Sequence, residues 1–444
     1  MRLTERQGKI RMGIGIENYR EMREKGNYYV DKTRLIAEYL EAEDKVTLLM
    51  RPRRFGKTLN MSMLAEFFDI TKDSADIFEG TEILGTKWVS EMNQYPVISL
   101  SFANARGDSE DFLFRFLASE VRKEYMRYEF LWEEKKVSEN MGRELSKIYD
   151  SLWNREKPDG GDNIAESLTE LCSALEWYYG KKVKVFIDEY DTPFIQAMIG
   201  GFYRKVRPVL SSMLGSLLKG NPSLGSAYLT GIQRVAKENI FSGLNNLAVC
   251  DVNSPEYADC FGFTEEETKR LLEACGLELS EKVRQMYDGY RFGDNHIYNP
   301  WSVVYYARRK RLEPFWVNTG ENGLIRSAME ELGEEFRPGY EELIENGKYS
   351  TEVKMDNSYY EVRDVETLWG LLLSSGMVTA EKILEDGECI LRVPNQEVMR
   401  AFRELTSIYL GIREGDMSQM FLRLTEKKVE AFTDSYRRIL KTLP

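Results

Sequence analysis

The sequence has 444 residues, of which 42% are hydrophobic and 12% aromatic, enough to bury a full core and to exclude a disordered chain. The net charge of −12 provides no overall field that attracts nucleic acid, so any such contact would have to be local. One histidine and five cysteines without a Cys-x-x-Cys pair argue against a structural zinc site and a histidine-based catalytic triad.

The length predicts about two to four structural units. The N-terminus lacks the apolar core of a signal peptide, and no window of the sequence approaches a membrane span, so we expect no membrane contact. Scattered cysteines are typical of a reducing compartment, and we therefore expect a cytoplasmic protein.

The first part of the chain alternates strand and helix patterns. Asp31 is placed to cap a helix with one apolar face, and an apolar strand follows at 46–50. The further strands are predicted at 97–102, 183–187, 225–230 and 247–251, with helices at 109–129, 163–179 and 204–219. This alternation predicts an α/β fold with a parallel sheet covered on both faces, and with ligands beyond the carboxyl ends of the strands.

The stretch from Arg51 to Thr58, Arg-Pro-Arg-Arg-Phe-Gly-Lys-Thr, lies between the first strand and a helical pattern, the context in which Gly-Lys-Thr predicts a phosphate-binding loop. Lys57 would reach the β- and γ-phosphates of a nucleotide, and the Thr58 hydroxyl would hold Mg²⁺. Backbone N–H groups at the helix N-terminus would surround the phosphate oxygens. The full pattern has Gly where this chain has Arg51. The expected nucleotide-binding residues are Arg53, Arg54, Phe55, Gly56, Lys57, Thr58 and Leu59.

A second element supports the first. The apolar run from Val183 to Ile187 has the length of a strand and ends in Asp188 and Glu189. Asp188 is predicted to bind the Mg²⁺ shell, and Glu189 to orient and polarise the attacking water. Each element alone also has a structural interpretation, because Gly-Lys-Thr begins many helices and Asp-Glu often lies in a solvated turn. Their order and contexts together predict nucleotide binding.

Two candidate catalytic residues lie at the end of the strand 225–230. Thr230 would hold the attacking water or contact the γ-phosphate, or else it satisfies its own backbone at a strand end. Arg234 would reach phosphate as an arginine from the same chain, or else it is a surface charge.

The phosphate loop contains a cluster of arginines. One of Arg51, Arg53 and Arg54 is expected to touch the nucleotide. The others are expected to anchor the loop to acidic partners such as Asp188 or Asp191.

The predicted organisation has four parts: a P-loop unit, a mainly helical lid or bridging unit, a small α/β or winged-helix-like unit, and an amphipathic C-terminal helix. Their ranges are 1–255, 256–345, 346–415 and 416–444. Thr264 is expected to cap the first helix of the lid. In the third part, strands at 358–363 and 388–393 are expected to flank a helix at 365–376.

Several stretches together resemble one family. They are Tyr28-Tyr-Val-Asp-Lys-Thr33, Leu49-Met-Arg-Pro-Arg-Arg-Phe-Gly-Lys-Thr-Leu59, Val185-Phe-Ile-Asp-Glu-Tyr-Asp-Thr-Pro193, Thr230-Gly-Ile-Gln-Arg-Val235, Phe241-Ser-Gly-Leu-Asn-Asn-Leu247, Tyr287-Asp-Gly-Tyr290, Tyr298-Asn-Pro-Trp-Ser302 and Phe315-Trp-Val-Asn-Thr319. From about residue 12 to about residue 415 the chain resembles the AAA-ATPase-like proteins of bacteria and some archaea. The resemblance implies a P-loop sheet of the additional-strand type, ATP and Mg²⁺ as ligands, and Arg51 as a feature of the family's own phosphate loop.

Members of this family commonly carry a C-terminal nuclease-like domain, which we expect to be absent from this chain except for the predicted C-terminal helix, which would be its first helix. Glu352-Val-Lys354 has the Glu-x-Lys spacing of such nucleases, but no aspartate lies on a preceding strand at a suitable distance. We therefore expect an exposed strand of alternating charge, with no nuclease activity and no strong nucleic-acid binding by this chain alone.

Three functions remain open at the level of sequence. The leading one is an ATP-binding and ATP-hydrolysing module whose lid reports the nucleotide state to the C-terminal region or to a protein partner. The second is a nucleotide-dependent switch with little turnover, which lacks an arginine supplied by a neighbouring subunit of a homo-oligomer. The third is a DNA-processing or defence scaffold that has lost its nuclease domain.

Overall fold

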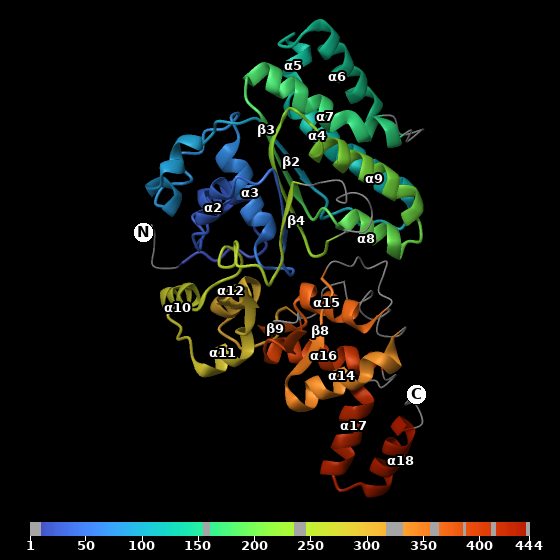
Figure 1. The fold of residues 1–444 in the computed structure, drawn as a ribbon. Helices are drawn as coiled ribbons and strands as arrows, with labels where there is room; N and C mark the ends of the chain where they lie inside the picture. The colour runs from blue at the N-terminus through green and yellow to red at the C-terminus, as the bar shows by residue number, and fades with distance from the viewer. Residues whose placement is uncertain are drawn as a thin grey trace.

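The computed structural model contains a central sheet flanked by helices and a second group of elements beneath it (Figure 1). The sheet has five strands in the order β2-β3-β4-β1-β5, and every neighbouring pair is parallel, as the sequence predicts. The strands are β1 Val46–Met50, β2 Val97–Ser101, β3 Val183–Asp188, β4 Leu224–Gly231 and β5 Leu247–Cys250. The structure describes residues 10–153, 160–234, 246–316, 332–355, 364–384, 388–409 and 414–440.

Helices cover both faces of the sheet, and the alternation of side chains along β1 shows why. Val46 and Leu48 join a buried cluster on one face, whereas Leu49 joins the cluster on the other. Parallel strands bury both faces in this way, so they need helices on each side. The face that carries Leu49 packs against α3 (Lys57–Phe68). The opposite face packs against α4 Glu110–Arg127, α7 Gly160–Tyr179 and α9 Tyr203–Leu218 (Figure 1).

The register brings the carboxyl ends of the inner strands to one edge of the sheet. Met50 lies opposite Gly231 on β4, and Ser101 lies opposite Asp188 on β3. The segments that follow these strands therefore leave the sheet at the same edge, where ligands bind in parallel α/β sheets. Because β4 lies between β1 and β3, Thr230 stands between the phosphate-loop strand and the strand that ends in Asp188.

Two N-terminal helices precede the phosphate loop. They are α1 (Tyr19–Glu24), which packs against α3, and α2 (Arg34–Ala42). The prediction that Asp31 caps the second helix is wrong in position, because the N-cap residue is Thr33. Asp31 Oδ1 instead accepts hydrogen bonds from the Thr33 amide and hydroxyl at 2.9 and 2.8 Å, which forms a turn just before the helix.

Short helices complete this part of the chain and lie in the connections between the strands. They are η1 Glu82–Gly85, η2 Lys87–Glu91, α5 Phe130–Glu133, α6 Glu139–Ser151 and α8 Thr192–Ile199.

A mainly helical segment follows β5. Thr264 caps its first helix with a hydrogen bond from the Glu267 amide, and the Glu267 side chain accepts from the Thr264 amide, so the predicted cap is confirmed. The elements are α10 Glu265–Ala274, α11 Glu281–Tyr287, the hairpin strands β6 Tyr290–Phe292 and β7 Asn295–Ile297, and α12 Pro300–Arg309. The assignment of this segment as a separate lid stays a prediction.

A three-stranded antiparallel sheet in the order β8-β10-β9 forms the next part. Its strand at 388–392 and the helix at 365–375 agree with the sequence prediction, while the strand predicted at 358–363 lies outside the described residues. The elements are α14 Gly333–Asn346, β8 Tyr349–Glu352, α15 Val365–Ser375, β9 Thr379–Ile383, β10 Glu388–Arg392 and α16 Gln396–Tyr409. One buried apolar cluster continues from α3 into α15 and α16, so this sheet packs onto the side of the molecule that carries α3.

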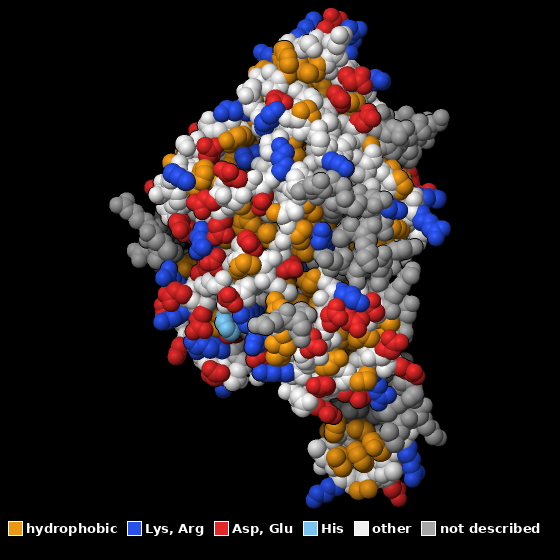
Figure 2. Space-filling view, viewed as in Figure 1, with side chains coloured by type: hydrophobic (Ala, Val, Ile, Leu, Met, Phe, Trp, Pro, Cys, Tyr) orange, Lys and Arg blue, Asp and Glu red, His pale blue; other side chains and the backbone are white. Residues whose placement is uncertain are grey.

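The C-terminal segment is a hairpin of two helices, α17 (Glu414–Thr425) and α18 (Val429–Leu440), and the prediction of one continuous helix is wrong. The chain turns at Lys427, whose φ of 58° lies in the left-handed region, and the Lys428 amide donates to the Arg423 carbonyl. Exposed apolar side chains gather on this hairpin (Figure 2). Within the residues that the structure describes, none of the helices is both long and apolar enough to cross a membrane.

Candidate functional site

The loop between β1 and α3 turns sharply before the helix begins. Arg54 has a φ of 68° and Gly56 a φ of 90°, a conformation that glycine adopts at little cost because it has no Cβ. Helix α3 starts at Lys57, and its first internal hydrogen bond runs from the Asn60 amide to the Gly56 carbonyl. The amides before Asn60 therefore have no partner inside the helix and are available to an anion at this N-terminus.

Lys57 is buried at the start of α3. Its Nζ donates hydrogen bonds to the carbonyl oxygens of Arg51 and Pro52 at 2.8 and 2.9 Å. Burial lowers the pKa of Lys57, while the nearby carboxylates of Glu189 and Asp188 raise it. Because the two carbonyl partners carry no formal charge, the loop places a positive charge in a confined space that suits a phosphate group.

Asp188 joins three parts of the edge through one carboxylate. Its Oδ2 accepts a hydrogen bond from Thr58 Oγ1 at 2.7 Å, and its Oδ1 accepts one from Thr230 Oγ1 at 2.5 Å. Burial raises the pKa of Asp188, and the two hydroxyl donors and Lys57 oppose that effect. Four residues selected from the sequence, Lys57, Thr58, Asp188 and Thr230, are thus brought together.

Glu189 leaves the end of β3 with a φ of 50°. Its amide donates to Thr230 Oγ1 at 3.2 Å, and its Oε2 accepts a hydrogen bond from Thr192 Oγ1 at 3.1 Å. The same Oε2 lies 3.7 Å from Nη2 of Arg106. The Thr230 hydroxyl therefore bonds to Asp188 and Glu189 rather than to its own backbone, and the Glu189 side chain is held on two sides.

Asp191 stabilises the backbone that follows β4. Its Oδ2 accepts hydrogen bonds from the amides of Ile232 and Gln233 at 2.8 and 3.0 Å. Burial raises the pKa of Asp191 to about 6, although these two amides act in the opposite direction. Arg234 follows directly in a half-buried position, and neither Arg234 nor Thr230 is among the described residues that line the cleft beside the loop.

Arg51 and Arg54 of the phosphate loop bind carbonyl oxygens, which corrects the expectation that they anchor the loop to Asp188 or Asp191. The Arg51 guanidinium is fully buried and donates to the carbonyls of Cys250 and Glu256, each at 3.2 Å. Burial lowers the pKa of Arg51.

The Arg54 guanidinium donates to the Phe315 carbonyl at 3.0 Å and lies over the ring of Trp301, with its Cζ 4.3 Å from the ring centroid. These contacts fasten the loop to later parts of the chain. Arg53 contributes its carbonyl, which accepts from Trp316 Nε1 at 3.5 Å, and it lines the cleft.

A cleft of about 520 Å³ opens beside the loop, a size suited to a nucleotide-sized ligand. It is lined by the phosphate loop with the start of α3, by two N-terminal stretches, by Arg106 and Glu189, and by the helical segment after β5. The N-terminal stretches contribute residues 12–17 and 28–30. The helical segment contributes Phe263, Leu271, Pro300, Trp301, Val304 and Tyr305.

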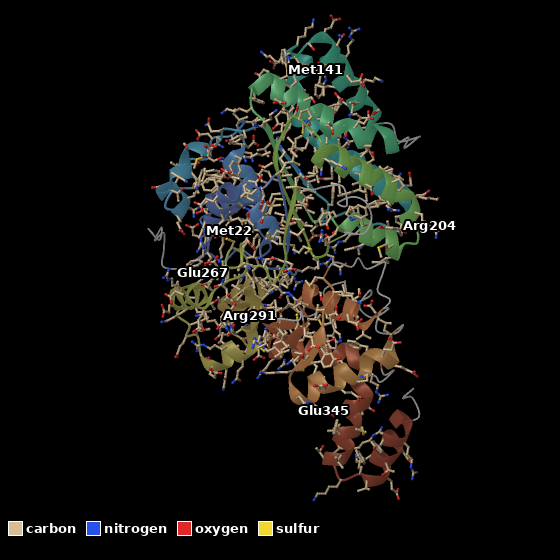
Figure 3. All side chains as sticks on the ribbon, viewed as in Figure 1. Met22, Met141, Arg204, Glu267, Arg291 and Glu345 are labelled. Carbon is tan, nitrogen blue, oxygen red and sulfur yellow. The ribbon has the colours of Figure 1, made fainter. Side chains whose placement is uncertain are left out.

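An ion pair links the N-terminal stretches to the helical segment after β5. Lys32 Nζ lies 2.7 Å from Glu267 Oε2 on α10 and also donates to the Asp259 carbonyl. Met22, a lining residue of the cleft, and Glu267 lie on the two sides that this ion pair joins (Figure 3). The far wall of the cleft is therefore built by residues more than 200 positions away in sequence from the N-terminal wall.

Two charged residues of the cleft were missed by the sequence prediction. Arg106 follows β2, and Glu17 lies in the N-terminal stretch. Burial and the neighbouring carboxylates of Asp188 and Glu189 raise the pKa of Glu17. Neither residue belongs to a recognisable motif. The one available signal is that Arg106 follows a predicted strand and so had to lie at the same edge of the sheet.

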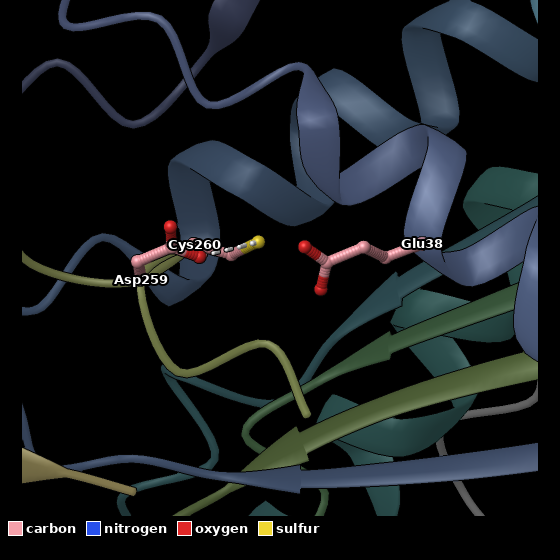
Figure 4. A group of neighbouring side chains, drawn as sticks. All are labelled: Glu38, Asp259 and Cys260. Atoms are coloured by element: carbon pink, nitrogen blue, oxygen red, sulfur yellow. Dashed lines mark hydrogen bonds between the residues drawn. The ribbon is translucent and has the colours of Figure 1, made fainter. Parts of the chain in front are cut away.

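A group of three side chains elsewhere has the spacing of metal ligands. The ligand atoms of Glu38, Asp259 and Cys260 lie within 4.8 Å of one another (Figure 4). Arg34, however, forms ion pairs with Glu38 at 2.9 Å and with Asp259 at 3.1 Å, and burial raises the pKa of the Cys260 thiol. The Arg34 guanidinium thus offsets part of the carboxylate charge, and the raised pKa disfavours the thiolate that a metal would bind, so the group does not favour a metal ion.

Two comparisons with known proteins identify what this chain is similar to. An uncharacterized protein in the vnfD 5′ region of Azotobacter chroococcum mcd 1 is 27% identical over 402 residues, which cover 89% of this chain and 69% of that protein. A family model described as a predicted AAA-ATPase matches residues 13–241, more than half of the chain, and this range contains the loop at 51–58 and the Asp188-Glu189 pair. The chain therefore belongs to the predicted AAA-ATPase family.

Proposed function

We propose that this protein binds ATP with Mg²⁺ at the sheet edge where β1, β3 and β4 end, hydrolyses it, and transmits the nucleotide state to its C-terminal region. The observation that carries the proposal is the bridge made by Asp188 between Thr58 and Thr230 beside the free N-terminus of α3. A strand-end carboxylate bonded to the hydroxyl that follows a phosphate-loop lysine is the arrangement that P-loop nucleotide hydrolases need. The position of β4 between β1 and β3 supports the additional-strand type of this fold.

Phosphate binding would rest on Lys57 and the first amides of α3. The Lys57 ammonium is buried, and burial strengthens its attraction to an anion because little water screens the charge. The backbone from Phe55 to Leu59, together with Gly56 in its left-handed conformation, would surround the phosphate oxygens. Arg53 lines the same cleft and would contribute a further positive charge.

Thr58 and Asp188 fit a magnesium ion. Mg²⁺ prefers oxygen ligands, and Thr58, which lines the cleft, carries a hydroxyl oxygen 2.7 Å from the buried Asp188 carboxylate, which is not itself a lining residue. When bound, the ion would neutralise charge on the phosphate oxygens.

Glu189 would act as the general base for hydrolysis. Its Oε2, held by Thr192 at 3.1 Å, belongs to a side chain that lines the cleft. Water would attack the γ-phosphorus in line: a bond from the water oxygen forms, the bond to the ADP oxygen breaks, and Glu189 accepts the water proton. Thr230 would position this carboxylate through the Glu189 amide.

A chain of contacts that runs from the phosphate loop through the 315–316 backbone to α16 supports coupling to the C-terminal region. Glu397 of α16 is fully buried, and its carboxylate accepts hydrogen bonds from the Trp316 amide at 2.7 Å and from Ser302 Oγ at 2.8 Å. The loop residue Arg54 donates to the carbonyl of Phe315, the neighbour of Trp316. A shift of the loop on nucleotide binding would therefore act on the 315–316 backbone and, through it, on α16.

A second function, a nucleotide switch with little turnover, is favoured by one contact. Glu189 already faces Arg106, so its carboxylate is partly engaged before any substrate arrives. The test that separates the two functions is titration calorimetry with MgATP, MgADP and MgGTP, followed by steady-state phosphate release. ATP binding with turnover supports the hydrolase, and binding without turnover supports the switch. The absence of binding by any of the three nucleotides contradicts both.

A further inference from the structure

Arg106 shares the candidate site with the residues that would carry the chemistry. It lines the cleft together with Lys57, Thr58 and Glu189. The loop that carries Arg106 is fixed where it leaves β2, because the Phe102 amide donates to the Asp188 carbonyl at 2.9 Å. The position of Arg106 is therefore set by the same strand end that carries the candidate metal ligand.

The pair between Arg106 and Glu189 is suited to exchange. Its shortest N–O distance is 3.7 Å, and the Arg106 side chain is 46% exposed. Long, exposed ion pairs contribute little to stability, because solvent screens them and the side chain loses freedom when it is held. Arg106 also donates Nε to the Ala103 carbonyl at 3.1 Å, a local bond that keeps the guanidinium near the cleft.

A triphosphate would be the stronger partner for this guanidinium. Arginine binds phosphate through two parallel hydrogen bonds, and both partners carry full charges. Glu189 would not be left unsupported, since its hydrogen bond from Thr192 does not involve Arg106. Exchange of the partner would thus free the carboxylate for water and at the same time add a positive charge beside the transferred phosphoryl group.

We propose that Arg106 recognises the γ-phosphate: it pairs with Glu189 in the nucleotide-free chain and moves to the γ-phosphate when a triphosphate binds, which releases Glu189 as the base. This inference rests on the proposed function and assigns to Arg106 the discrimination between ATP and ADP. It also explains how a chain whose base is engaged at rest would hydrolyse ATP without an arginine from another subunit.

The test compares Arg106→Ala and Arg106→Lys with a matched surface control. Arg115→Ala is that control, because Arg115 lies on α4, is 53% exposed and forms a local ion pair with Asp111 at 2.7 Å. Titration calorimetry measures affinity for MgADP and for a non-hydrolysable ATP analogue, and phosphate release measures kcat. We expect Arg106→Ala to keep the MgADP affinity within about 3-fold, to lose about 10-fold or more in affinity for the analogue, and to lose about 10²-fold or more in kcat. The affinities and kcat of Arg106→Lys should lie between those of the wild type and those of Arg106→Ala, and Arg115→Ala should match the wild type.

Three outcomes would overturn the inference alone. In the first, Arg106→Ala keeps both the wild-type preference for the triphosphate and the wild-type kcat. In the second, it loses affinity for both nucleotides to the same extent. In the third, it hydrolyses ATP faster than the wild type, which would make the pair only an inhibitory contact. A wild-type chain that binds neither nucleotide would instead overturn the proposed function and this inference with it. Melting temperatures of all variants separate these results from loss of folding.

Discussion

Replacement of Thr230 by valine tests the centre of the site, because it changes the shape of the side chain little and removes one buried hydroxyl. That hydroxyl donates to Asp188 Oδ1 at 2.5 Å and accepts from the Glu189 amide at 3.2 Å. A hydrogen bond to a charged group contributes about 1.5–3 kcal/mol, and a buried amide without a partner costs about 1–3 kcal/mol. We therefore expect a loss of about 3 kcal/mol in the free energy of unfolding of the part of the chain that contains the parallel sheet.

Thr47→Val provides a matched control on the neighbouring strand. Thr47 lies on β1, is fully buried, and its hydroxyl has no hydrogen-bond partner among the described residues. The same chemical change should therefore be neutral or slightly stabilising there. Thermal unfolding of both variants, followed by tryptophan fluorescence, should place Thr230→Val roughly 6–12 °C below the wild type. The reasoning is refuted if the two variants melt at the same temperature.

The same substitution predicts a shift in the pH dependence of hydrolysis. Hydrogen bonds from Thr230 and Thr58 lower the pKa of Asp188 against the effect of burial. Without the Thr230 hydroxyl, the pKa of Asp188 rises further, so the ionised carboxylate that would serve the metal forms only at higher pH. We expect the acid limb of the kcat profile to move to higher pH in Thr230→Val and to stay in place in Thr47→Val.

Four further predictions concern single residues. Lys57→Ala should abolish the nucleotide-induced rise in melting temperature, since the triphosphate loses its main countercharge; a wild-type rise would show that the phosphate loop is wrongly assigned. Glu189→Gln should bind MgATP and hydrolyse it roughly 10²-fold more slowly, and an unchanged rate would move the base to another carboxylate, first Asp191. Because the pKa of Asp191 is raised to about 6, the folded chain binds this proton more tightly than the unfolded chain, so the contribution of this group to stability should fall by about 3 kcal/mol as pH rises from about 4 to about 6; in urea unfolding, the wild type should lose about that much stability relative to Asp191→Asn over this range. Incubation with plasmid DNA and Mg²⁺ or Mn²⁺ should give no cleavage, because no aspartate lies on a strand that precedes Glu352-Val-Lys354 at a suitable distance; cleavage that disappears in Glu352→Ala would contradict this.

Much of the fold could be predicted from local patterns. The five strands of the parallel sheet are short apolar runs bounded by polar residues, and the Gly-Lys-Thr of residues 56–58 lies between a strand and a helix as its pattern requires. The hairpin turn at Lys427 was missed, because lysine carries no signal for a left-handed conformation. The edge strand β8 was expected too late in the chain, at 352–354 instead of 349–352, since its residues alternate between partly buried and exposed positions without a buried face.

The sequence by itself determined the residue types of the site: a lysine and a threonine after β1, and an Asp-Glu pair after β3. It could not determine their partners, because Thr58 and Asp188 are 130 positions apart and Thr230 lies 42 positions after Asp188. Only the register of the parallel strands decided that these side chains meet at one carboxylate. Only the packing of the later segments decided that Arg54 binds the 315–316 backbone and that Arg106 faces Glu189, because such contacts depend on how separate elements fold together and leave no periodic pattern in the chain.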